Sequence, residues 1–212
     1  MKNQDYIDSL NFRYATKKFD AYKNLSTQQL EDVKEAIQLT ASSYGLQPYE
    51  VFIIEDTNTR EKLKEVSYGQ PQITDSSQLI VFAVNTKIDE NYLDNYIKNI
   101  SETRNVSVES LQEMRDTIAG TTLQMDQEAK TTWAQKQAYI ALGNLLSAVA
   151  FYGFDACPME GFENEKYNEI LGLKDKNLHA TVIATIGYRS DEDELQHAAK
   201  VRKPKNELFT HI

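Results

Sequence analysis

The sequence comprises 212 residues, of which 41% are hydrophobic and 26% are charged. These values are ordinary for a globular protein, and the length fits one domain over residues 1–212 with a single sizeable core. The formal net charge of -9 repels a phosphate backbone, so nucleic acid is not an expected partner. An anionic cofactor would have to meet a local cluster of Lys and Arg.

Cysteine usage and hydrophobic patterning indicate a cytoplasmic protein. The chain has one cysteine, Cys157, so it cannot form an internal disulfide, which suits a reducing compartment. The uncharged stretch 137–154 is long enough for a membrane span. It contains Gln137, Asn144 and two glycines, and no second span accompanies it, so we expect a buried core helix and no membrane.

The N-terminal half alternates helices with short strands. A short helix is expected over residues 3–11, followed by the basic connector RYATKKFD. Ser26 begins a second helix that reaches about Ala41, and Gln29 completes its capping box. A strand over 51–54, a helix capped by Thr57 that ends near Val66, and a strand over 79–84 come next. The segments ASSYGLQPYE and YGQPQITDSS between these elements are expected to be loops.

The C-terminal half is dominated by helices. Polar helices are expected to about residue 119, then a long apolar helix over 123–152. A strand over 154–159, a short helix opened by GFENEKYNEI and a strand over 180–186 follow. The tail is basic from Lys200 and then extended. Alternating helices and strands indicate an α/β or α+β protein.

Common cofactor and metal motifs are missing. The eight glycines form neither G-x-G-x-x-G nor a Walker pattern, so no Rossmann or P-loop site is indicated. The three histidines do not pair with another His or Cys at ligand spacing, and no metal site is expected. Cys157 is expected to pack in a strand, although a Cys–His nucleophile remains an alternative.

Two basic clusters stand out in this acidic chain. One holds Arg13, Lys17 and Lys18; the other holds Lys200, Arg202, Lys203 and Lys205. If folding joins them, they form a pocket for a dianionic phosphate, because Arg supplies a fork of donors and Lys a point charge. The alternative is two solvated surface runs.

Three further segments, the first two without formal charge, offer polar groups. ASSYG supplies hydroxyls and backbone N–H groups, and GQPQ supplies amides that match the imide edge of a heterocycle. PMEGF ends a strand, where backbone N–H groups become free to face a ligand. Ordinary turn chemistry is the alternative for each segment.

Five segments in this order resemble the nitroreductase family of flavoproteins: RYATKKFD, ASSYGLQPYE, QITDSSQLIVFAVNT, PMEGF and KVRKP. TWAQKQAYIALGNLL is similar to the central helix of that family. The resemblance covers most of the chain outside residues 86–120. It includes the oxygen-insensitive NAD(P)H nitroreductases and dihydropteridine reductase-like members.

The resemblance implies an α+β fold with a central, mostly antiparallel sheet flanked by helices, in an intertwined homodimer with FMN at the interface. It implies hydride transfer from NADH or NADPH to a small organic acceptor, such as a nitroaromatic or quinone. Because no G-x-G-x-x-G segment is present to hold a dinucleotide, nicotinamide and acceptor are expected to take turns in one pocket, which predicts a ping-pong mechanism. The alternative is a flavin-binding storage or sensor protein. Independently, a helix apolar on nearly every face around 133–150 indicates a subunit interface.

The resemblance also implies roles for particular residues. No side chain is expected to be catalytic, because the chemistry takes place at flavin N5. The FMN phosphate would be held by Arg13, Lys200 and Arg202, and Lys17 would lie near the flavin pyrimidine. The ribityl chain and pyrimidine edge would be bonded by Gln70 and Gln72, while Glu160 and Gly161 would present backbone N–H groups to the flavin. The cofactor site would be completed by Tyr14 and Ala15, and by Ser42 and Ser43 of the partner subunit. Tyr44 is expected to stack on the substrate ring.

Overall fold

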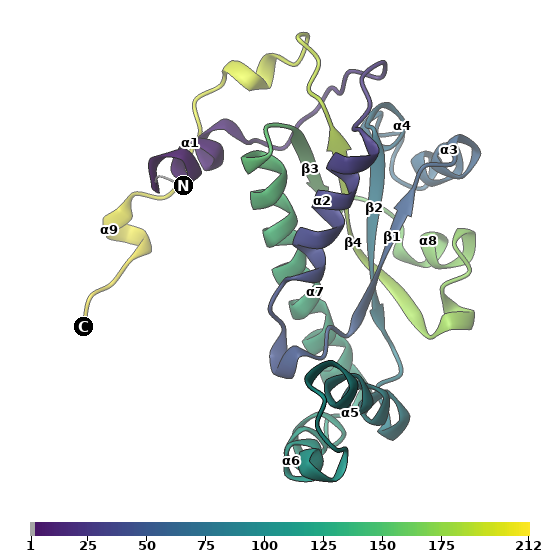
Figure 1. Ribbon diagram of the computed structural model, residues 1–212. Coiled ribbons are helices and arrows are strands. Elements are labelled where there is room, and N and C mark those ends of the chain that lie inside the picture. Colours follow the sequence, from purple (N-terminus) through teal and green to yellow (C-terminus); the bar gives the residue numbers. More distant parts are fainter. Residues whose placement is uncertain (1–2) are drawn as a thin grey trace.

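The computed structural model describes residues 3–212, in which helices cover both faces of a four-stranded sheet (Figure 1). The strands are β1 (Tyr49–Ile54), β2 (Gln78–Asn85), β3 (Asp155–Met159) and β4 (Leu178–Gly187). Their order is β1-β2-β4-β3, and each neighbouring pair is antiparallel. The expected α+β fold with a central antiparallel sheet is therefore confirmed.

The two central strands are buried on both faces, which explains their nearly continuous apolar sequences. Alternate residues of β2 point to opposite faces. Ile80 and Phe82 belong to the cluster that packs under α2 (Thr27–Gln38) and α7 (Gln127–Phe151). Leu79 and Val81 belong to the cluster on the other face, where α3 (Thr57–Glu65), α4 (Gln72–Asp75) and α8 (Asn164–Ile170) lie (Figure 1).

The long helix α7 is buried along one side only. Ala138, Ala141 and Leu145 pack in the core, whereas Tyr139 and Ile140 remain 40% and 50% exposed. The apolar character seen in the sequence is thus only partly explained by packing within one chain. No helix among residues 3–212 is long and apolar enough to cross a membrane.

Helices α5 (Glu90–Arg104) and α6 (Gln112–Thr122) form a pair that lies at one end of α7, and we call this pair the excursion (Figure 1). They confirm the polar helices expected in this region. Their inward residues Leu93, Ile97 and Ile118 form a small separate core with Leu46. The excursion is therefore packed onto the loop before β1.

The two ends of the described chain lie on the same side of the molecule. α1 (Asn3–Phe12) contacts α7, and the segment after β4 passes α1 and then leaves the body (Figure 1). This C-terminal segment contains a 3-10 turn (Glu194–His197) and α9 (Lys205–Leu208). We call residues 199–212 the C-terminal arm.

Several element boundaries differ from those expected. Asp56, not Thr57, caps α3, because its carboxylate accepts from Thr59 N–H at 2.7 Å. The long helix begins at Gln127 because Asp126 caps it after a turn. The YGQPQITDSS loop contains α4, and the tail that was expected to be extended contains α9. α2 ends at Gln38.

Candidate functional site

A cationic pocket lies where the segment after α1 meets the segment that follows the 3-10 turn. Its cavity measures about 400 Å³. The lining residues are Asn11, Phe12, Arg13, Tyr14, Ala15, Lys17, Leu195, Gln196, Ala198, Ala199, Lys200 and Arg202. Six of the residues expected to bind a cofactor are therefore brought together, although they come from opposite ends of the sequence.

The cations of this pocket repel one another. Burial and the charge of Arg202 lower the pKa of Arg13, while burial and the charges of Arg13 and Arg202 lower the pKa of Lys200. Among residues 3–212, none of these three side chains forms a salt bridge with a carboxylate. Lys200 Nζ instead donates to two carbonyl oxygens, those of Leu10 at 2.8 Å and of Arg13. Folding thus joins the two basic clusters, and an anion would relieve their repulsion.

A buried ion pair supports the junction beneath the pocket. Arg189 Nε donates to Asp155 Oδ1 at 2.9 Å, and Arg189 N–H donates to Asp155 Oδ2 at 3.0 Å. The guanidinium also lies over the rings of Phe12 and Tyr14, at 3.9 and 4.6 Å from their centroids. Since Asp155 is 4% exposed, this pair fixes the end of α1 against β3 with little access of water.

The segment that carries Arg13 and Lys17 also runs beside β3. Ala15 forms a parallel bridge with Ala156, which brings Lys17 near the buried thiol of Cys157. Burial raises the pKa of Cys157, while the charges of Lys17 and Arg13 oppose that rise. Cys157 packs in the core cluster beneath the sheet, as its sequence context indicated.

A second cluster of polar residues lies at the end of β3. Gln70 Nε2 donates to the carbonyl oxygen of Gly161 at 2.7 Å, which joins the GQPQ and PMEGF segments. The Glu160 carboxylate accepts from the Tyr139 hydroxyl at 2.6 Å. Burial first, and then Glu160, raise the pKa of Tyr139 to about 12. Gln72 is 5% exposed, and its Oε1 has no hydrogen-bond partner within residues 3–212.

The serines of the ASSYG segment lie elsewhere in the same chain. Ser42 Oγ accepts from Gln47 N–H at 2.9 Å, and Ser43 N–H donates to Gln137 Oε1 of α7 at 2.8 Å. Neither serine lines the cationic pocket. The structure thus does not bring Ser42 and Ser43 together with the cationic residues within one chain.

Hydrogen bonds hold Tyr44 against the helices α5 and α6. Its backbone φ of 57° is in the left-handed region, which costs a non-glycine residue free energy. The Tyr96 hydroxyl donates to Tyr44 O at 2.5 Å, and the Tyr44 hydroxyl donates to Thr121 Oγ1 at 3.2 Å. The Tyr92 hydroxyl donates to Leu46 O at 3.1 Å. Tyr44 remains 39% exposed, so one part of its ring is accessible.

Comparison with known proteins decides the family. A model described as the nitroreductase family matches residues 10–188. This chain belongs to the nitroreductase family. Its relatives include a Staphylococcus haemolyticus protein named "putative NAD(P)H nitroreductase", which is 32% identical over 97% of this chain and 96% of its own length. The resemblance drawn from the sequence segments is therefore confirmed.

Solved structures share the nitroreductase fold. The Bacillus subtilis protein ydfN has a TM-score of 0.87 and 21% identity, and the alignment covers 100% of both chains. A protein of Exiguobacterium sibiricum, solved in complex with FMN, has a TM-score of 0.85 and 18% identity over 100% of this chain and 99% of its own. At these identities the likeness establishes the fold.

Sequence reasoning did not identify several residues that shape the site of this nitroreductase-family protein. Gln137, Tyr96 and Asp193 each bond a segment that is distant in the chain. None belongs to a motif, so only the folded chain reveals these contacts. The described residues also contain no group of His, Cys, Asp or Glu side chains that could hold a metal ion.

Gly45 is expected to be required beside Tyr96. A Cβ at Gly45 would lie 2.6 Å from the Tyr96 hydroxyl oxygen, and the backbone φ is +78°. Gly45→Ala should lower the free energy of unfolding by about 2 kcal/mol, measured by chemical denaturation. In a Tyr96→Phe background the loss should be smaller, because the hydroxyl is gone.

The control for this double-mutant cycle is Gly120→Ala. Gly120 lies in α6, and no atom is within 4 Å of a Cβ built there. That change should be neutral or stabilising, because alanine favours a helix. An equal loss for Gly45→Ala in both backgrounds would refute the contact with Tyr96.

Proposed function

We propose that this protein is an FMN-dependent oxidoreductase that takes hydride from NADH or NADPH and reduces a small organic acceptor. Residues 1–212 act as one domain in the cytoplasm. The observation that carries the proposal is the cavity where Arg13, Lys200 and Arg202 converge. A relative bears the name of an NAD(P)H nitroreductase, and a protein of the same fold was solved with FMN, which supports this assignment.

The donor set of the pocket fits the phosphate of FMN. Two guanidinium groups and two ammonium groups line a cavity of about 400 Å³. Charge-assisted hydrogen bonds from Arg to a phosphate are strong and directional. Binding a dianion there would offset the mutual repulsion that lowers the pKa values of Arg13 and Lys200. Tyr14 and Ala15 line the same cavity and would contact the cofactor.

The polar groups at the end of β3 fit the rest of the cofactor. Gln72 keeps a buried Oε1 that has no partner within residues 3–212, and a ligand donor would satisfy it. Gln70 would bond the ribityl chain or pyrimidine edge, and Glu160 and Gly161 would offer backbone N–H groups. The bond between Gln70 and Gly161 O fixes these segments relative to each other.

Bound FMN supplies the capacity to accept and donate hydride. The protein binds and orients it. The ammonium of Lys17, which lines the pocket, would favour the reduced cofactor by attracting its negative charge. The chain has no dinucleotide-binding glycine motif, so we propose that nicotinamide and acceptor occupy one pocket in turn, which gives ping-pong kinetics. The exposed ring of Tyr44 would stack on the nicotinamide or on the acceptor, whichever occupies the pocket.

Anaerobic reduction tests this function. The purified protein should be yellow, should be bleached by NADH or NADPH without oxygen, and should regain its colour when a nitroaromatic or quinone is added. Yellow protein that neither nucleotide bleaches would favour the alternative, a flavin storage or sensor protein. Protein that is colourless after incubation with FMN and removal of the unbound FMN would refute both functions.

Arg202→Ala should weaken FMN binding by about 2 kcal/mol, because a hydrogen bond to a charged phosphate is lost. Riboflavin lacks the phosphate, so its affinity should hardly change. Titration of flavin fluorescence measures both affinities. Lys203→Ala is the matched control, since Lys203 is adjacent, exposed and not among the residues that line the cavity. An equal loss for both flavins would exclude a phosphate role for Arg202.

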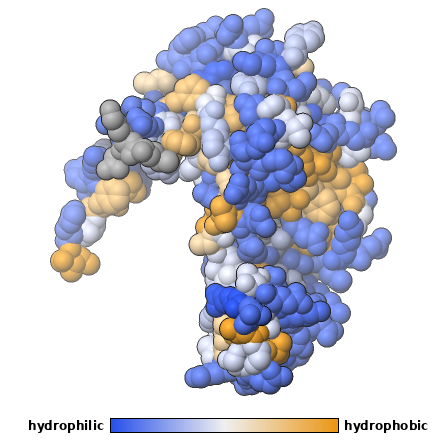
Figure 2. Space-filling model, viewed as in Figure 1, coloured by the Kyte–Doolittle hydropathy of each residue, from blue (hydrophilic) through white to orange (hydrophobic). Residues whose placement is uncertain are grey.

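We also propose an intertwined homodimer with the FMN site at its interface. The exposed apolar face of α7 and the C-terminal arm support this proposal. Leu208, Phe209 and Ile212 of the arm are 59%, 59% and 122% exposed, and Figure 2 shows apolar side chains along the arm away from the body. A second copy would cover such surfaces. The partner would then supply Ser42 and Ser43 to the site.

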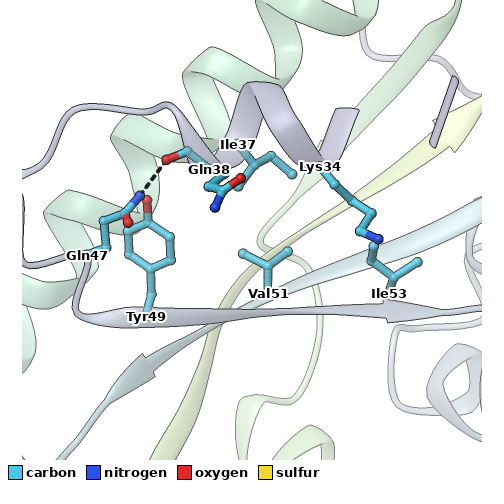
Figure 3. A pocket seen from close by; sticks show the side chains of 7 residues that line it. All are labelled: Lys34, Ile37, Gln38, Gln47, Tyr49, Val51 and Ile53. Atoms are coloured by element: carbon cyan, nitrogen blue, oxygen red, sulfur yellow. Dashed lines mark hydrogen bonds between the residues drawn. The ribbon is translucent and has the colours of Figure 1, made fainter. Parts of the chain in front are cut away.

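A groove beside β1, an edge strand of the sheet, is the proposed binding site for the C-terminal arm of the partner subunit. Its cavity of about 410 Å³ lies between α2 and β1 (Figure 3). The lining residues are Lys34, Ile37, Gln38, Gln47, Tyr49, Val51 and Ile53. Gln47 Nε2 donates to Gln38 O at 2.9 Å and closes one end of the groove. The remaining apolar floor and the unpaired strand edge suit an extended apolar segment.

Phe209→Ser combined with Leu208→Ser should shift the protein from dimer toward monomer in light scattering, because it removes apolar surface from the arm. Tyr22→Ser is the control, since Tyr22 is 98% exposed and lies far from the arm in sequence. A wild-type protein of monomer mass in the presence of FMN would refute the dimer.

A further inference from the structure

Asp193 is a buried carboxylate directly behind the wall of the cationic pocket. It is 2% exposed and is not among the residues that line the cavity. Its Oδ2 accepts from Lys17 N–H at 2.7 Å, from Lys18 N–H at 3.0 Å and from the Tyr14 hydroxyl at 2.9 Å. Its Oδ1 accepts from Leu195 N–H at 3.1 Å.

These bonds connect the two walls of the pocket. One wall carries Arg13 and Lys17, and the other begins at Asp193 and carries Lys200 and Arg202. Other residues each make one hydrogen bond to this loop. Ser190 N–H donates to Lys18 O at 3.0 Å, and Lys200 Nζ donates to Arg13 O. Thr16 N–H donates to Ala156 O at a long 3.4 Å. Asp193 therefore provides the largest set of hydrogen bonds on the loop from which two of the cations project.

Only an ionised carboxylate satisfies this arrangement. Three donors converge on one oxygen, and bonds to an ionised acceptor are stronger than neutral ones. Burial alone would raise the pKa of Asp193, but the N–H groups of Lys18 and Lys17 and the Tyr14 hydroxyl outweigh it, so the pKa is lowered. An asparagine would keep the shape, but it would have fewer lone pairs and would turn an NH₂ donor toward other donors.

We infer that Asp193 is a positioning residue for phosphate recognition. It holds the 13–18 loop so that Arg13 faces the same point as Lys200 and Arg202, and it does so without touching the ligand. The consequence is selectivity for a phosphorylated flavin over the same flavin without phosphate. This inference rests on the proposed FMN function.

The test measures the affinities of FMN and riboflavin for Asp193→Asn by flavin fluorescence. The ratio of the two affinities should fall about tenfold, because a misplaced Arg13 weakens phosphate contacts that riboflavin does not make, whereas a displaced Lys17 affects both flavins alike. Glu192→Gln is the matched control. It removes one negative charge from the adjacent residue, whose side chain is 82% exposed and pairs with Lys18 at 3.6 Å. The ratio should not change in this control.

Tyr14→Phe is a second variant that removes one donor to Asp193 and leaves the backbone bonds in place. Its ratio should fall in the same direction by a smaller factor. It decides the question if thermal denaturation shows that Asp193→Asn does not fold. An unchanged ratio in the folded variants, or an equal fall in Glu192→Gln, would overturn the inference. Wild-type protein that binds neither flavin, or both equally, would overturn the phosphate site itself.

Discussion

Mutual repulsion of cations is the constraint on which the site depends. Arg13, Lys200 and Arg202 come together in a chain whose net charge is -9, yet none of them has a carboxylate partner within residues 3–212. The free energy that holds them there must come from the surrounding scaffold. Carbonyl oxygens bind Lys200, and buried Asp155 and Asp193 anchor the two backbone segments from behind. The carboxylates of Asp155 and Asp193 thus hold the walls of the cationic pocket without lining its cavity.

The sheet supplies the rigid base for this arrangement. The start of β3, at Ala156, lies beside the loop of Lys17, and the end of β3 leads into the turn that carries Glu160 and Gly161. Gln70 then joins this turn to the segment before α4. Hydrophobic layers on both faces of β2 and β4 bury these strands almost completely, so the ends of the strands have little freedom to move.

Helix α7 and the helices α5 and α6 hold the ASSYG segment away from the lining of the cationic pocket. Tyr96 and Thr121 hold Tyr44, while α7 uses Gln137 to hold Ser43 on a different side from the cationic pocket. The apolar face of α7 around Tyr139 and Ile140 remains exposed. The proposed homodimer would account for both features, because it would join the serine loop of one chain to the pocket of the other and bury the helix face.

Much of the fold was predictable because local signals agreed with tertiary packing. The capping box at Ser26 and Gln29 is formed as expected, and the apolar runs of β2 and β4 became central strands. The boundaries of α3 and α7 were missed by one and four residues, respectively, because Asp56 and Asp126 cap these helices. Capping depends on a side-chain contact that several neighbouring residues could make.

By itself the sequence determined the basic residues and, through five ordered segments that resemble one family, the family and its α+β fold; the alternation of helices and strands alone left α/β and α+β open. Only the tertiary structure decided that the two basic clusters meet, because about 190 residues of chain separate them and the hydrogen bonds that join their walls have no local pattern. The same reason hid Asp193 and Tyr96. Each acts on a backbone segment that lies 175 or 176 residues away in one case and 52 in the other. Residues at such separations become neighbours only when the core has formed.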